Sequence, residues 1–113
     1  MDYLKNEKKV AIELYNFMCK HENQTPVSFG FCKMKASGSC TYSTKVGIKK
    51  PIAITLNIET GSFGAAWVLI HEFAHKVCIR KYNDATHGSK FKSELKRLES
   101  IYLDCEIANK FIF

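Results

Sequence analysis

The stretch HEFAH, residues 71–75, lies in the middle of the apolar run AAWVLIHEFAHKVCI, residues 65–79. In a helix, side chains four residues apart lie on the same face, so His71 and His75 can hold one metal ion through their imidazoles. Burying two unpaired imidazoles one turn apart would cost free energy, which disfavours a purely structural role. We therefore expect a metal site within a core helix, and zinc suits imidazole ligands.

Glu72 follows the first histidine and is expected to lie beside the metal without binding it. A carboxylate in that place can accept a proton from a metal-activated water and later donate a proton to a leaving amine. The pattern HExxH therefore predicts a metal-dependent hydrolase with Glu72 as its catalytic general base.

A catalytic zinc site usually takes a third protein ligand and keeps a fourth position open for water. The metzincin pattern would require glycine at position 78 and histidine at position 81, but the chain has Cys78 and Lys81, which excludes that class. Two candidates remain: Glu94 further along the chain, and His87 in THGSKF, where Gly88 would let the backbone approach a metal. Spacing alone leaves both candidates open.

Length and apolar periodicity indicate one α+β domain over residues 1–113. Apolar residues that recur every three or four positions predict three helices, at residues 2–22, 62–82 and 89–108. Three β-type runs lie between the first two helices, at residues 27–35, 39–46 and 52–58, and are separated by ASG and by GIKKP. We expect a small three-stranded, mainly antiparallel sheet or meander with the helices packed on it.

The formal net charge is +6, and the positive charge is concentrated in one segment. Residues 23–58 contain no aspartate or glutamate and five lysines, namely Lys33, Lys35, Lys45, Lys49 and Lys50. Lysines of this kind either protect strand edges from aggregation or bind the phosphates of a nucleic acid, with Tyr42 available to stack on bases. The sequence leaves both interpretations open.

The chain has no run of 18 apolar residues, and its N-terminal MDYLKNEKK is charged throughout. We therefore expect no contact with a membrane and no signal peptide. The five cysteines include no CxxC pair, which favours reduced packing thiols. Together these features predict a cytoplasmic protein, associated with a nucleoid or a nucleus if it acts on DNA.

HEFAH followed by HGSKFKSELKRL resembles the SprT-like family of zinc metalloprotease domains, whose pattern is HExxH, a short spacer and HGxxF. Upstream, SGSCTY and ITLNI are similar to two strands of that family, so the resemblance covers roughly residues 36–100. It implies a minimal zincin-like fold and one Zn²⁺ per chain, held by His71, His75 and His87. By the same resemblance, Glu72 is the general base.

The resemblance also implies a protein substrate, bound or crosslinked to DNA, with DNA as a partner. Where relatives often have proline and an acidic residue after the HG pair, this chain has Ser89 and Lys90. No cysteine ribbon follows, so the expectation of DNA binding depends on residues 23–58. Two alternatives to a DNA-directed peptidase are a non-catalytic zinc module that binds nucleic acid and a cytosolic peptidase with no DNA role.

Overall fold

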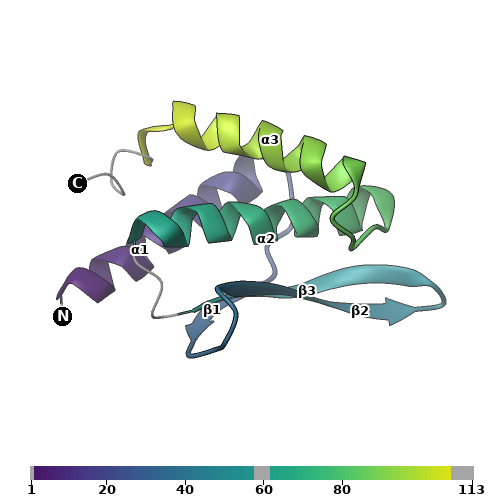
Figure 1. Cartoon of the computed structure of the whole chain (residues 1–113), viewed down its shortest axis with the longest axis horizontal. Coiled ribbons are helices and arrows are strands. Elements are labelled where there is room, and N and C mark those ends of the chain that lie inside the picture. Colours follow the sequence, from purple (N-terminus) through teal and green to yellow (C-terminus); the bar gives the residue numbers. More distant parts are fainter. Residues whose placement is uncertain (1, 58–61, 108–113) are drawn as a thin grey trace.

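Helix α2 (Ser62–Tyr82) lies at the centre of the computed structural model, between a three-stranded sheet and two further helices (Figure 1). The structure describes residues 2–57 and 62–107. Helices α1 (Asp2–His21) and α3 (Ser89–Asp104) pack against α2, and all three helices cover the same face of the sheet. The predicted α+β class is therefore confirmed.

The core surrounds α2 on both sides. Its largest fully buried apolar side chains come from all three helices and from the sheet, and they are Leu14, Met18, Ile54, Leu56, Leu69, Ile70, Phe73, Val77, Leu98 and Tyr102. On α1 and α3 one face is buried and the other is exposed, as the apolar periodicity predicts. From Ala65 to Ile79, α2 has no exposed residue, because it is covered by the sheet on one side and by helices on the other.

The sheet consists of β1 (Ser28–Cys32), β2 (Gly38–Lys45) and β3 (Ile48–Asn57), in the spatial order β1-β3-β2. The long central strand β3 pairs antiparallel with β2 and parallel with β1. The expected three-stranded sheet is present and its longer pairing is antiparallel, but the sheet is mixed and is not a meander, because β1 pairs parallel with β3 and the first two strands are not neighbours.

The loop of residues 33–37 explains this order. It carries the chain over the end of β3, from one edge of the sheet to the other. There the side-chain amide of Asn57 donates hydrogen bonds to the carbonyl oxygens of Met34 at 2.8 Å and Ala36 at 3.1 Å. Turn residues in the sequence mark where a strand ends, but they do not show which edge the next strand joins.

Strand β3 begins at Ile48, four residues before the predicted start, and includes Pro51. The strand register shifts between Thr41 and Tyr42, which leaves Ile52 without a partner on β2. Proline has no N–H to donate, so it is tolerated within a strand at such a bulge. The segment GIKKP, expected to separate two strands, therefore lies mostly within one of them.

Strands β2 and β3 form a hairpin that extends beyond the helices (Figure 1). Its two-residue turn, Val46–Gly47, has positive φ angles of 53° and 77°. Two successive positive φ angles match the twist of a tight hairpin. Val46 is 92% exposed, so the tip of the hairpin presents an apolar side chain to the solvent.

The predicted helices agree with the observed ones to within one residue at the end of α1 and at both ends of α2. Helix α3 ends at Asp104, before its predicted end, and predicted positions 58 and 108 lie outside the described residues. All five cysteines are free thiols, as predicted. Within residues 2–57 and 62–107, no helix combines the length and apolar character needed to cross a membrane.

Candidate metal centre

Three imidazoles converge where α2 meets the loop that leads to α3. The Nε2 atom of His87 lies 3.1 Å from Nε2 of His75 and 3.3 Å from Nε2 of His71. The three candidate ligand atoms all lie within 4.8 Å of one another. Tetrahedral zinc with bonds of 2.0–2.1 Å would separate its ligand nitrogens by about 3.3 Å. The three histidines therefore lie close enough to bind one metal ion.

Helix α2 fixes two of these imidazoles, because His71 and His75 are one turn apart on the same face, with ring centroids 5.1 Å apart. Burial lowers the pKa of His71, and the neighbouring His87 imidazole lowers it further. Burial and the two neighbouring imidazoles lower the pKa of His75 to about 4. Both rings are therefore neutral near pH 7, which is the form that binds a metal.

Phe91, from the first turn of α3, packs against all three imidazoles. Its ring centroid lies 4.9 Å from that of His71, 4.4 Å from that of His75 and 4.9 Å from that of His87. The side chain is only 4% exposed, so it forms a rigid apolar support behind the histidines. In the sequence, the place of Phe91 in HGSKF, four residues after His87, is the signal that points to this contact.

Short-range hydrogen bonds shape the loop that carries His87. The carboxylate of Asp84 accepts hydrogen bonds from the backbone N–H of Thr86 at 2.8 Å and from its hydroxyl at 2.6 Å. The N–H of Gly88 donates to the same hydroxyl oxygen at 3.3 Å. An aspartate that binds the backbone two residues later is a common turn former, and here the turn sets the direction of the following His87.

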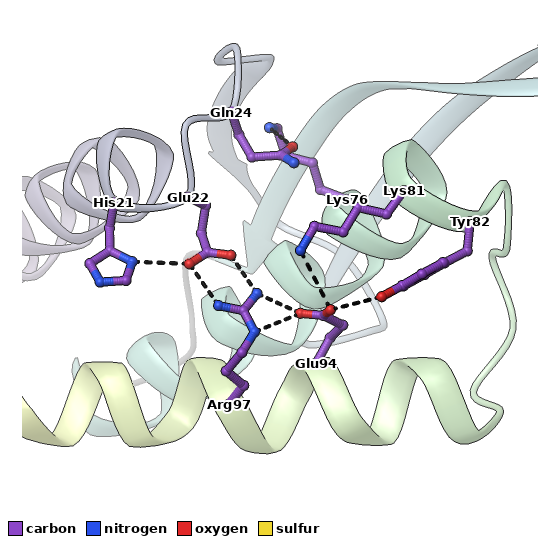
Figure 2. A network of polar contacts seen from close by, with 8 residues as sticks. All are labelled: His21, Glu22, Gln24, Lys76, Lys81, Tyr82, Glu94 and Arg97. Atoms are coloured by element: carbon purple, nitrogen blue, oxygen red, sulfur yellow. Dashed lines mark hydrogen bonds and ion pairs between the residues drawn. The ribbon is translucent and has the colours of Figure 1, made fainter.

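Glu94, the other candidate for third ligand, belongs to a separate network (Figure 2). Its carboxylate accepts hydrogen bonds from the guanidinium of Arg97 and, at 3.2 Å, from the hydroxyl of Tyr82. The ammonium of Lys81 lies 3.6 Å away. Arg97 also binds Glu22, so the network joins the end of α1 to α2 and α3. Within the described residues, the metal-binding group consists of the three histidines and does not include Glu94.

Glu72 lines the same pocket as His71, one of the three converging histidines, and is only 8% exposed. Burial raises the pKa of its carboxyl group to about 7. The side chain faces β2, since a Cβ atom on Gly38 would lie 3.3 Å from its Cγ. A carboxyl group that titrates near neutral pH, beside a potential metal, is suited to exchange protons with a reacting group.

A pocket of about 330 Å³ opens beside this carboxyl group. Its lining combines the start of β2 with one face of α2, namely Ser37, Gly38, Trp67, Val68, His71 and Glu72. A larger pocket of about 620 Å³ lies at the ends of α1 and α3 and includes none of the three converging histidines. The smaller pocket is the candidate substrate site, because it contains both a potential metal ligand and the buried carboxyl group.

The residues predicted to contact nucleic acid fall into two groups at opposite ends of β3. Lys33 and Lys35 lie in the loop beside Asn57, whereas the hairpin group consists of Tyr42, Lys45, Lys49 and Lys50. The hairpin group lies six to nine residues of β3 away from Asn57, which at about 3.3 Å per residue separates the two groups by roughly 20–30 Å. The basic segment is continuous in sequence, but β2 carries the chain from one end of the sheet to the other and so divides the segment in space.

The three converging histidines and the adjacent carboxyl group of Glu72 are the features from which a function can be inferred. Their spacing and geometry agree with the HExxH and HGxxF motifs quoted above. Comparison of the chain with protein-family models, with curated proteins and with solved structures finds no significant match, so membership of the SprT-like family stays a prediction from these motifs.

Proposed function

We propose that this chain is a zinc-dependent metallopeptidase of the SprT-like type. The observation that carries the proposal is the convergence of three imidazole nitrogens beside the buried carboxyl group of Glu72. A donor set made only of imidazoles favours zinc, and three protein ligands with a fourth open position are typical of catalytic zinc sites. His71, His75 and His87 would be the ligands.

Zinc, when bound, would supply a Lewis acid that acidifies a coordinated water and polarises the carbonyl group of a peptide. Glu72 accepts the proton of the attacking water and donates it to the nitrogen of the leaving amine. Phe91 holds the three imidazole rings in their orientations, and the low exposure of Glu72 keeps its carboxyl group near the reacting atoms.

The open edge of β2 offers a route for the substrate. Among the described residues, strand β2 pairs with β3 on one side and has no partner on the other, so an extended peptide can add to that edge through backbone hydrogen bonds. Gly38, at the start of β2, lies against Glu72, and Trp67 and Val68 line the adjoining pocket. A substrate strand on this edge would bring a peptide carbonyl near Glu72 and one apolar side chain to the pocket.

Exchange of Glu72 for Gln tests the mechanism, because Gln keeps the shape of the side chain and cannot act as a base. We expect unchanged zinc content per chain and a loss of about 10²–10⁴-fold in hydrolysis of casein, an unstructured protein. Glu106→Gln, the same change at an exposed position after α3, is the control and should keep full activity. Hydrolysis that survives in zinc-loaded Glu72→Gln would refute the mechanism, and zinc binding without hydrolysis in wild type would favour the non-catalytic module.

We further propose that the hairpin group contacts nucleic acid and brings DNA-bound or DNA-crosslinked proteins to this site. The supporting observation is that the projecting hairpin carries three lysines, no acidic residue and a tyrosine that is 40% exposed. Lysines bind phosphates, and an exposed aromatic ring can stack on a base.

The salt dependence of binding to a single-stranded oligonucleotide tests this second proposal. Each lost phosphate contact reduces the slope of log K against log salt by about 0.7, so Lys45→Ala with Lys50→Ala should reduce the slope by about 1.4. Lys33→Ala with Lys35→Ala, at the other end of β3, is the matched control. Equal losses in both pairs would contradict the assignment to the hairpin, and absence of binding at low salt would leave a peptidase without a nucleic-acid partner.

A further inference from the structure

Asn83 follows the last residue of α2 and has a positive φ of 54°. Its N–H donates to the carbonyl oxygen of Ile79 at 3.0 Å, which closes the end of the helix. A helix often ends on a residue in this left-handed conformation, and asparagine is the commonest one after glycine. Helix termination alone would therefore be satisfied by glycine at this position.

The side chain of Asn83 makes contacts that glycine cannot make. Its Oδ1 accepts a hydrogen bond of 2.6 Å from the backbone N–H of Lys49, and its Nδ2 donates one of 2.9 Å to the carbonyl oxygen of Gly47. The ammonium of Lys49 also lies 3.5 Å from the carbonyl oxygen of Asn83. One amide group thus binds both a donor and an acceptor of the hairpin turn, 34 and 36 residues away in sequence.

The same residue begins the loop that carries His87. The imidazole of His87 is exposed, and its hydrogen-bond partners are the other two imidazoles. Its position therefore depends on the backbone of residues 83–88 and on Phe91. The Asp84–Thr86 turn fixes the inside of this loop, and Asn83 fixes its beginning against the hairpin.

We propose that Asn83 is a positioning residue for the metal ligand His87, which it holds in place by binding the α2–α3 loop to the β2–β3 hairpin. This inference rests on the proposed metal site. It makes the hairpin a structural support of the metal centre. Without the two side-chain hydrogen bonds, the loop begins from a less restricted residue, and the third ligand occupies its binding position for a smaller fraction of the time.

Asn83→Gly tests the inference, because glycine keeps the positive φ and removes the side-chain hydrogen bonds. Loss of a residue that orients a ligand typically weakens metal binding by about 10–100-fold, and we expect a loss of that size in a chelator competition assay. Bound Co²⁺ should show weaker visible absorption, which indicates a less complete tetrahedral site. The helical circular dichroism should not change.

Asn23→Gly is the matched control, since Asn23 also follows a helix with a positive φ, of 53°, and lies at the end of α1. Its zinc affinity should equal that of wild type. Wild-type affinity in Asn83→Gly would overturn the inference, and so would an equal loss of affinity in both variants. A wild-type chain that binds no zinc would instead refute the proposed function, so the two failures are distinguishable.

Discussion

Gly38→Ala is expected to reduce catalysis while leaving metal binding intact. A Cβ atom at this position would lie 2.6 Å from Cγ1 of Val68, 3.1 Å from the carbonyl oxygen of Thr55 and 3.3 Å from Cγ of Glu72. Carbon atoms in contact prefer separations of about 3.5–4.0 Å, so the Val68 methyl group would have to move by about 1 Å. Val68 is β-branched and lies in a helix, which restricts its rotation, and the Thr55 oxygen belongs to the backbone of β3.

Overpacking of this kind lowers the free energy of unfolding by about 1–3 kcal/mol. Replacing glycine by alanine also restricts the unfolded chain, which raises the free energy of unfolding by about 0.4–1 kcal/mol. We therefore expect the free energy of unfolding, measured in urea, to fall by about 1–2 kcal/mol. The displaced side chains include the proposed general base Glu72, whose Cγ would have to move by only a few tenths of an ångström. Because a shift of about 1 Å in a catalytic group can reduce kcat/KM by about 10²-fold, we expect a loss smaller than about 10²-fold. Zinc affinity should stay within about twofold of wild type, because the close contacts are with Val68, Thr55 and Glu72 and not with the imidazoles.

Gly30→Ala is the matched control for this substitution. Gly30 lies in β1 of the same sheet, and a Cβ atom there would meet no atom within 4 Å. Its activity should equal that of wild type, and its stability should be equal or slightly higher. Wild-type activity in Gly38→Ala would show that β2 does not approach Glu72 so closely, and loss of zinc in parallel with activity would show that the effect passes through the metal.

His87→Ala should weaken zinc binding by more than about 100-fold, because loss of a residue that only orients a ligand already weakens binding by about 10–100-fold. A chelator competition measures this, and retained tight binding would favour Glu94 as the third ligand after all. Lys76 is fully buried, and burial lowers its pKa to about 8. An unfolded lysine keeps its proton up to about pH 10.4, so the free energy of unfolding should rise between about pH 8 and pH 10.4. Urea titrations at several pH values measure this rise, which should be smaller in Lys76→Met. A hydrogen bond from Arg97 is the main reason that the pKa of Glu22 is lowered, so this pair stabilises the fold above the ordinary carboxyl pKa of about 4.3 and less as the pH falls below it. Arg97→Ala should reduce the free energy of unfolding by about 2 kcal/mol at pH 7 and by less at pH 3, with equal losses at both pH values counting against the argument.

The helices could be predicted well from the sequence, because each depends on local spacing. Apolar residues at three and four positions marked Leu14 and Met18 on α1, and Leu98 and Tyr102 on α3, and all four are buried. Helix α2 was predicted from the same spacing of apolar residues. Its position between two layers explains why its apolar run is continuous.

The sheet could be predicted only in part, because strand order depends on contacts between distant segments. Its three strands were identified, but the parallel pairing of β1 with β3 depends on a loop that crosses the end of β3 at Asn57. Pro51 was expected to lie in a segment between two strands and instead lies within β3, beside a bulge. The division of the lysines into two groups does not depend on strand order, since β2 carries the chain along the sheet between Lys35 and Lys45.

The candidate site could also be predicted only in part, because some of its residues are placed by local spacing and others by contacts between distant segments. The spacing of His71 and His75 was sufficient to predict that the two imidazoles lie side by side, because a helix holds residues four apart on one face. His87 lies beyond the helix, so spacing could not separate it from Glu94. The structure separates them through Arg97, which binds the carboxylate of Glu94, and through Asn83, whose contacts with the hairpin appear in no local pattern.

Burial has opposite effects on the two kinds of group at this site. It favours neutral imidazoles, which assists metal binding, and it raises the pKa of Glu72, which hinders the ionised carboxylate that a general base requires. A dication held by three imidazoles would oppose the second effect, because a nearby positive charge stabilises a carboxylate. A ligand that binds only the folded chain also stabilises it, by about 2.7 kcal/mol at 100 times its dissociation constant. Metal binding would therefore be linked both to the ionisation of Glu72 and to the folding stability of the chain.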